Sequence, residues 1–292
     1  MLTMAQLSPL LLLLSISNLF ISGVYSESTF TLINNCDYTV WPGILSNSGV
    51  SPLNTTGFVL QKGESKSISA PNSWGGRLWG RTHCTQDPTG TLSCLTGDCG
   101  SGKLECSGGG AIPPATLAEF TLNGHDNMDF YDVSLVDGYN LPMVVVPQGG
   151  SGDKCSTIGC FVDLNEACPP ELKMVSSDGE RVACKSACEA FGEDEYCCSG
   201  AYGKPETCKP SEYSELFKKA CPTAYSYAYD DGSSTFTCSG GAGYLITFCP
   251  TQIFNTKYYS SYGGVSEAST STVAGGVVVV VATWLLLSSH LI

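Results

Sequence analysis

Short apolar runs alternate with polar turns along most of the chain, from about residue 27 to residue 250. Runs of β-branched and aromatic residues are typical of strands, and clusters of Gly, Pro, Asn and Asp between them are typical of turns. We expect strands within residues 28–36, 39–45, 57–61, 64–70, 77–84, 141–148, 235–238 and 244–249. This pattern predicts a mainly β fold, a sandwich or barrel of short strands.

Residues 115–140 form the most informative stretch, because they predict two strands joined by a polar turn at Asn123-Gly124. The stretch carries five carboxylates: Glu119, Asp126, Asp129, Asp132 and Asp137. Asp132 alternates with Val133, so we expect its side chain to point out of the core, whereas Asp137 precedes Gly138 in a turn beyond the strand. The sequence leaves open whether these carboxylates form a solvated face or the wall of an acidic site.

Residues 150–239 differ from the rest because cysteines crowd together and apolar runs shorten. We expect two helices here, Val182–Phe191 and Ser211–Ala220, with Ser211 as the N-cap of the second. This segment has too little apolar material for a core of its own. It therefore predicts a second subdomain, packed on the sandwich and held together by disulfides.

Both ends of the chain carry processing signals. Residues 1–26 are typical of a secretory signal peptide cleaved after Ser26. Residues 251–264 predict a polar linker, and residues 265–292 a removed propeptide that directs attachment of a GPI anchor. The attachment residue is expected among four small residues: Ser261, Gly263, Gly264 and Ser266. A single-pass membrane anchor and an uncleaved tail remain alternatives.

Charge and cysteine content narrow the function classes. The formal net charge is −13, which gives the protein no electrostatic reason to bind nucleic acid. The chain has 16 Cys, no CxxC pair and three His, so disulfides in an oxidising compartment are favoured over a metal site. No motif calls for a cofactor. Asn54-Thr55-Thr56 is a sequon for N-glycosylation.

Several motifs taken together resemble the thaumatin-like proteins of plants, the pathogenesis-related group. The matching pieces include NNCDYTVWPG, GRLWGRTHC, CLTGDCGSGKLEC, PPATLAEFTL, DFYDVSLVDGYN and EYCCSGAYGKPETC, with all 16 Cys in the family's order. The resemblance implies a flattened β-sandwich, a cysteine-rich subdomain with short helices, and a cleft between them. It also implies the disulfides Cys36–Cys249, Cys84–Cys94, Cys99–Cys106, Cys155–Cys238, Cys160–Cys221, Cys168–Cys184, Cys188–Cys197 and Cys198–Cys208.

The resemblance further implies a set of one arginine and four carboxylates along that cleft. The matching residues are Arg77, Glu119, Asp132, Asp137 and Asp230, with Asp231 as the fallback for the last. Two carboxylates flanking a glycosidic bond suffice for hydrolysis, and Glu119 and Asp132 are the candidate catalytic pair.

The resulting expectation is a monomeric defence protein, secreted to the cell wall or anchored on the outer face of the plasma membrane. It would bind β-1,3-glucan or another neutral polysaccharide, with at most weak endo-β-1,3-glucanase action. The alternative is a receptor-like or inhibitor protein without enzymatic activity.

Overall fold

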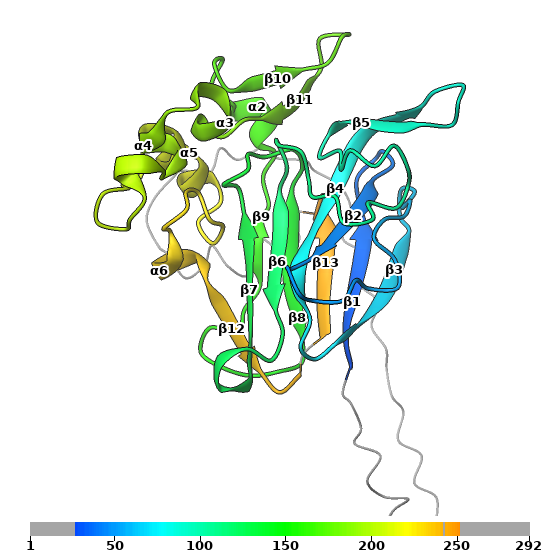
Figure 1. Ribbon diagram of the computed structural model, residues 1–292, viewed down its shortest axis with the longest axis vertical. Coiled ribbons are helices and arrows are strands. Elements are labelled where there is room, and N and C mark those ends of the chain that lie inside the picture. The colour runs from blue at the N-terminus through cyan, green and yellow to red at the C-terminus, as the bar shows by residue number, and fades with distance from the viewer. Residues whose placement is uncertain (1–26, 242, 252–292) are drawn as a thin grey trace, which may run out of the picture. The chain divides into compact units, whose positions relative to one another are not determined.

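The computed structural model describes residues 27–241 and 243–251, and two β-sheets form its centre (Figure 1). The first sheet has the order β3 (Ser65–Pro71), β1 (Glu27–Asn34), β13 (Gly243–Phe248), β8 (Met143–Gln148) and β9 (Ile158–Cys160). The second has the order β12 (Phe236–Ser239), β7 (Met128–Ser134), β6 (Leu117–Thr121), β4 (Gly75–Gln86) and β2 (Trp41–Ser46), and β5 (Leu92–Thr96) extends β4. The paired strands are antiparallel except β1 and β13, which run parallel. The predicted mainly β sandwich is therefore confirmed.

Aromatic side chains join the two sheets. Phe30 of the first sheet and Phe120 of the second have ring centroids 4.7 Å apart, and Tyr244 lies 5.0 Å from Phe120. All three are buried, and each such side chain contributes about 1.5–3 kcal/mol when fully removed from water. Asp129 belongs to this core, because its buried carboxylate accepts a hydrogen bond from the Tyr244 hydroxyl at 2.9 Å.

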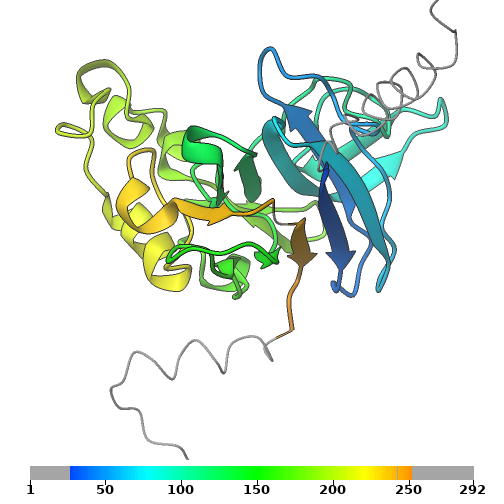
Figure 2. The same cartoon turned by 90° about the horizontal axis from the view of Figure 1, so that it is seen from below.

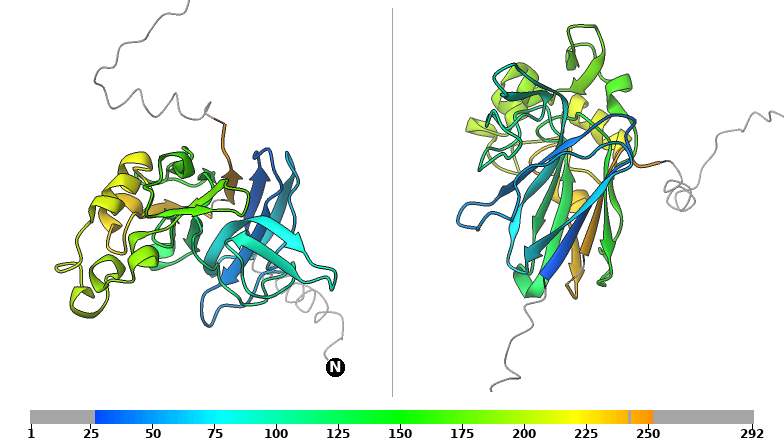
Figure 3. Two further views of the ribbon diagram at one scale, coloured as in Figure 1. Left: turned by 90° about the horizontal axis from the view of Figure 1, so that it is seen from above. Right: turned by 90° about the vertical axis from the view of Figure 1, so that its right-hand side faces the viewer.

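The remaining elements gather on one side of the sandwich, as Figures 2 and 3 show. They are the hairpin of β10 (Lys173–Val175) and β11 (Arg181–Cys184) and the helices α2 (Leu164–Ala167), α3 (Ala187–Phe191), α4 (Asp194–Cys197), α5 (Glu212–Ala220) and α6 (Asp231–Ser234). Two 3₁₀ turns, η1 (His125–Asn127) and η2 (Gly200–Tyr202), complete the elements. Among the described residues, no helix combines the length and the apolar character needed to cross a membrane.

The helix predicted over Ser211–Ala220 is confirmed, and Ser211 caps it by accepting a hydrogen bond from the Ser214 amide. The helix predicted over Val182–Phe191 is wrong in its first half, which is strand β11 followed by a short connection with Ser186 extended as the N-cap of α3. The reason is tertiary, since the amide and carbonyl of Cys184 both pair with the backbone of Tyr139 at 2.8 Å. An extended residue satisfies these groups, and a helical one would not.

A second correction concerns residues 57–61, predicted as a strand. They form only isolated bridges, Gly57 with Gly43 and Leu60 with Val40. Gly57 lies so close to the carbonyl of Leu104 that a Cβ atom would sit 2.1 Å from that oxygen. The neighbouring loop thus crosses here, where a longer strand pairing would continue.

Eight disulfides hold the described chain together. They are Cys36–Cys249, Cys84–Cys94, Cys99–Cys106, Cys155–Cys238, Cys160–Cys221, Cys168–Cys184, Cys188–Cys197 and Cys198–Cys208, the pairing that the family resemblance implies. Five of them join residues within 150–239, the segment with the fewest apolar runs. The predicted signal peptide, all but the first residue of the linker, and the GPI propeptide lie outside the described residues.

Candidate functional site

Three neighbouring strands place one arginine and two carboxylates side by side. Arg77 on β4 pairs directly with Glu119 on β6, and Glu119 pairs directly with Asp132 on β7. Directly opposite residues of antiparallel strands share one face of the sheet, with Cβ atoms roughly 4.5–5.5 Å apart. We call these three residues the acidic row. The two arms of the predicted hairpin thus hold their carboxylates in register, and β4 adds the cation.

Arg77 and Glu119 form an ion pair through a single, long contact. Arg77 Nε lies 3.4 Å from Glu119 Oε1, and both side chains are about one-third exposed, at 37% and 32%. Arg77 Nε is itself buried and makes no hydrogen bond within the described part of the chain. Burial raises the pKa of Glu119, while the charge of Arg77 lowers it and that of Asp137 raises it further. The pair is thus a single contact between two partly exposed side chains.

Asp132 is the most perturbed member of the acidic row. Its Oδ1 is buried and has no hydrogen-bond partner among the residues described. Burial is the main cause that lifts the pKa of Asp132 well above its usual value, and repulsion from Glu119 adds to it. Arg77 opposes the rise without cancelling it. Asp132 therefore holds its proton to a higher pH than an ordinary aspartate.

Asp137 lies beyond the end of β7, in the turn that the sequence predicts. The turn is closed by a hydrogen bond from the Gly138 amide to the Leu135 carbonyl, and Gly138 has φ +82°. A Cβ atom at Gly138 would meet the Cys184 carbonyl at 2.9 Å, so the turn packs directly on the segment before α3. Burial raises the pKa of Asp137 despite the opposing charge of Arg77.

The packing of this turn brings in Glu189 of α3, a residue that the sequence reasoning missed. Burial first, and then the charge of Asp137, raise the pKa of Glu189 to about 7, against the opposing charge of Lys185. Its Oε2 is buried without a hydrogen-bond partner in the described ranges. The Ser-x-x-Glu spacing from Ser186 to Glu189 is a helix-start signal. That signal places Glu189 on a helix but not next to Asp137.

Asp230 and Asp231 are neighbours in the sequence but have different surroundings in the structure. Asp230 Oδ2 lies 2.9 Å from Lys218 Nζ and also accepts from the amide and hydroxyl of Ser226. Burial alone would raise the pKa of Asp230, but these hydrogen bonds and one from Ser233 outweigh it and lower the pKa. Asp231 is exposed, and its charge acts on Asp132 and raises the pKa of that carboxyl. Of the two neighbouring aspartates, Asp231 is therefore the one whose charge affects the pKa of Asp132 in the acidic row.

Tyr225 links Asp231 to the sheet. Its hydroxyl donates to Asp231 Oδ1 at 2.7 Å, and its backbone bridges to Ser134 at the end of β7. Burial, followed by the hydrogen bond to Asp231 and the charges of Asp132 and Asp231, raises the pKa of Tyr225. The side of the site away from Arg77 thus combines a protonated phenol with an exposed carboxylate.

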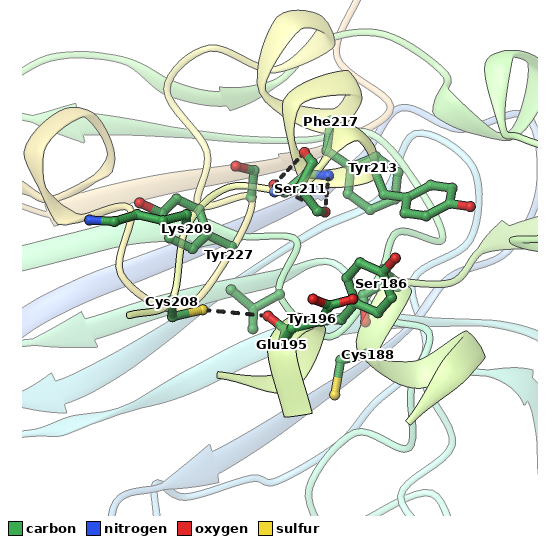
Figure 4. Close-up of a pocket in the computed structure, with 14 residues that line it drawn as sticks. Ser186, Cys188, Glu195, Tyr196, Cys208, Lys209, Ser211, Tyr213, Phe217 and Tyr227 are labelled. Carbon is green, nitrogen blue, oxygen red and sulfur yellow. Dashed lines mark hydrogen bonds between the residues drawn. The ribbon is translucent and has the colours of Figure 1, made fainter. Parts of the chain in front are cut away.

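An aromatic pocket lies next to the Asp137 turn, with Val136 in its wall (Figure 4). Tyr196 and Tyr213 line it, with ring centroids 5.9 Å apart, and Phe191 packs 5.3 Å from Tyr213. Tyr131, an aromatic residue of the β6–β7 hairpin, is buried in the core and does not line this pocket. No group of three or more His, Cys, Asp or Glu side chains that could hold a metal ion occurs in ranges 27–241 and 243–251.

Comparison with known proteins places this arrangement in a family. The model of the thaumatin family matches residues 34–250. The chain belongs to the thaumatin family. A thaumatin-like protein 1 of Arabidopsis thaliana is 59% identical over 229 residues, which cover 76% of this chain and 86% of that relative. A glucan endo-1,3-beta-glucosidase of Prunus avium is 52% identical over 246 residues, covering 84% of this chain and all of that relative.

Another similar relative is much longer. A PR5-like receptor kinase of Arabidopsis thaliana is 54% identical over 264 residues, covering 89% of this chain but 40% of the kinase. The chain thus spans less than half the length of that protein. Among solved structures, a laminaripentaose-producing β-1,3-glucanase of Paenibacillus barengoltzii, complexed with laminarihexaose, matches with a TM-score of 0.50. It is 13% identical, with 77% of this chain and 75% of that chain covered, so the likeness extends to the fold alone.

Proposed function

We propose that this thaumatin-family protein is a secreted defence protein that binds β-1,3-glucan of fungal walls along the acidic row, with weak endo-β-1,3-glucanase activity. The observation that carries the proposal is the row itself, in which Arg77, Glu119 and Asp132 stand in register on three strands. Buried Arg77 Nε and Asp132 Oδ1 lack hydrogen-bond partners among the described residues. A neutral polyol offers both donors and acceptors, and the partly exposed side chains of Arg77 and Glu119 give its hydroxyl groups one cation and one carboxylate to bind.

The perturbed pKa values suit the same row to glycoside chemistry. Hydrolysis needs one carboxylic acid to protonate the leaving oxygen and one carboxylate to act as nucleophile or base. Burial raises the pKa of both carboxyls, and that of Asp132 well above its usual value, which fits the acid. At Glu119 the charge of Arg77 opposes the rise, which fits the carboxylate. Asp137 and Asp231 complete the set at its two ends, with Asp231 taken in place of Asp230.

The test compares the wild-type protein with Glu119→Gln, Asp132→Asn and an Asp153→Asn control, which changes an exposed carboxylate elsewhere. Binding is measured by pull-down on insoluble β-1,3-glucan, and hydrolysis by release of reducing ends from the soluble polymer. We expect both row variants to lose binding by about tenfold, the effect of removing one hydrogen bond to a charged group, and the control to bind normally. Equal binding by all four proteins would refute the role of the row.

A second candidate function is a non-enzymatic one, as a receptor-like or inhibitor protein at the cell surface. The similarity of 89% of this chain to part of a receptor kinase favours it. Its signature in the same experiment is retained glucan binding without any release of reducing ends. Asp132 and Glu119 would then serve recognition alone.

We also propose secretion with removal of residues 1–26, N-glycosylation at exposed Asn54, and a GPI anchor on the outer face of the plasma membrane. Release of the protein from membranes by a phosphatidylinositol-specific phospholipase tests the anchor. Retention of the protein on those membranes would count against it.

A further inference from the structure

A second polar cavity, of about 620 Å³, lies apart from the acidic row and shares no lining residue with it. Its walls come from the loop after β1, from β4, from α2 and from the β10–β11 hairpin. The residues that matter for its chemistry are Asp37, Tyr38, His83, Asp163, Asn165 and Glu180. We call it the Tyr38 cavity.

The walls of the Tyr38 cavity are fixed by covalent and hydrogen bonds. The Cys36–Cys249 disulfide holds the loop that carries Tyr38, and Asn34 Nδ2 donates to the Tyr38 carbonyl at 2.8 Å. On the other wall, Asp163 Oδ1 caps α2 by accepting from the Asn165 amide at 2.9 Å. The backbone that carries these side chains is therefore already ordered, which lowers the entropic cost of binding.

The charge of the cavity is strongly unbalanced. Asp37, Asp163, Glu166 and Glu180 line it, and Arg181 is the one Lys or Arg side chain among its lining residues. Arg181 already forms an ion pair with Glu166, since Arg181 Nη1 lies 2.6 Å from Glu166 Oε2 at the exposed rim. Three carboxylates without a lysine or arginine partner in the cavity wall remain, and they favour a positively charged ligand.

Two further features point to a ligand rather than to a solvated acidic patch. Asn165 is 8% exposed, and its Oδ1 is buried without a partner in the described part of the chain, although its Nδ2 donates to the Asn140 carbonyl at 3.1 Å. Tyr38 is 41% exposed and stacks on His83, with ring centroids 6.5 Å apart and planes inclined by 27°. A buried acceptor without a partner and an exposed aromatic ring thus belong to residues that line the same cavity.

We propose that the Tyr38 cavity binds the guanidinium group of an arginine in a basic peptide or protein partner. A guanidinium group is planar, donates five N–H groups, pairs with carboxylates in a bidentate manner and stacks on aromatic rings. These properties match the carboxylates Asp163 and Asp37, the Asn165 oxygen and the Tyr38 ring. Burial, with added repulsion from Asp163 and Asp37, raises the pKa of Tyr38 to about 12, so its ring stays neutral at physiological pH.

The experiment titrates the protein secreted from the full-length chain with a fluorescent Arg-Gly-Arg peptide, at low salt, and follows anisotropy. A matched peptide with citrulline for arginine keeps the shape and removes the charge. Asp163→Asn retains a capping side chain for α2, and Asp37→Asn changes an exposed loop residue, so both variants are expected to fold. Each variant should bind the arginine peptide about tenfold more weakly, which is the effect of losing one hydrogen bond to a charged group.

The controls separate this site from the others. Asp153→Asn and Asp132→Asn, outside the cavity, should bind the arginine peptide like the wild type. Arg181→Gln should bind it more tightly, because it releases Glu166 from its internal partner. The proposal fails if the citrulline peptide binds equally well, if Asp132→Asn abolishes binding while Asp163→Asn does not, or if the wild type does not bind at all.

Discussion

Replacing Asp132 by Asn should make the protein more stable at neutral pH and should weaken the proposed glucan binding. The replacement keeps the size of the side chain and removes a buried charge that faces Glu119 and whose Oδ1 has no hydrogen-bond partner among the described residues. An unsatisfied buried group costs about 1–3 kcal/mol and more when it is charged, so we expect removal of the charge to recover free energy of that order. For a domain of this size, that gain corresponds to a rise in Tm of about 2–12 °C.

The pH dependence of this effect carries the test. Burial raises the pKa of Asp132 in the folded state, so the wild type binds more protons folded than unfolded and loses stability as pH rises toward that pKa. Asp132→Asn lacks this loss. The gain in Tm, measured by calorimetry or near-UV circular dichroism, should be close to zero at pH 4, near the unfolded pKa, and should grow toward pH 7.

Asp153→Asn serves as the control, because it removes an exposed carboxylate and should shift Tm little at either pH. A gain for Asp132→Asn that is equal at pH 4 and pH 7 would refute the electrostatic reasoning. A loss of stability at pH 7 would show instead that the Asp132 charge is well compensated by Arg77.

Three other predictions follow from the site and its surroundings. Glu189→Gln should remove a titration near pH 7 in the folded protein and a loss of stability between about pH 4.5 and pH 7, followed by NMR and by unfolding at several pH values. Asp230→Ala should cost about 1–3 kcal/mol in chemical unfolding, because Lys218 loses its carboxylate partner and keeps only the Ala224 and Ser234 oxygens. Asp231→Ala should change unfolding little and should weaken the proposed glucan binding more. Opening the Cys99–Cys106 disulfide by a double serine variant should raise the glycosylated fraction at Asn54, measured by a gel shift after endoglycosidase treatment. The reason is that Thr56 Oγ1 of the sequon donates to Glu105 at 2.8 Å and accepts from the Ser107 amide at 2.9 Å in the folded loop.

Local pattern was sufficient for the elements whose neighbours agree with it. All the β-rich runs except 57–61 became strands. The hairpin placed Glu119 opposite Asp132, because alternation and turn position define register within one hairpin. The connection is longer than the two residues Asn123-Gly124, since η1 follows them, yet the pairing is unaffected. Ser211 likewise capped its helix where expected.

Position relative to distant segments was not accessible from local pattern. Arg77 and Glu119 are 42 residues apart in the sequence and pair on neighbouring strands. Only the family resemblance suggested that they lie together. Cys184 became extended because Tyr139 pairs with its backbone. The difference between Asp230 and Asp231 depends on which of two adjacent carboxylates reaches Lys218, a choice made by the fold of α5 and α6.

The distribution of disulfides explains how the chain tolerates so many unfavourable carboxylates. Burial raises the pKa values of Glu119, Asp132, Asp137 and Glu189, so each of them reduces stability at neutral pH. Each disulfide contributes about 2–4 kcal/mol against unfolding. Five of the eight lie within residues 150–239, the side that supplies Glu189 and Asp231, whereas Arg77, Glu119 and Asp132 stand on strands held by the aromatic core. Disulfides therefore offset the cost of the buried carboxylates within residues 150–239, and the aromatic core offsets it beneath the strands that carry Arg77, Glu119 and Asp132.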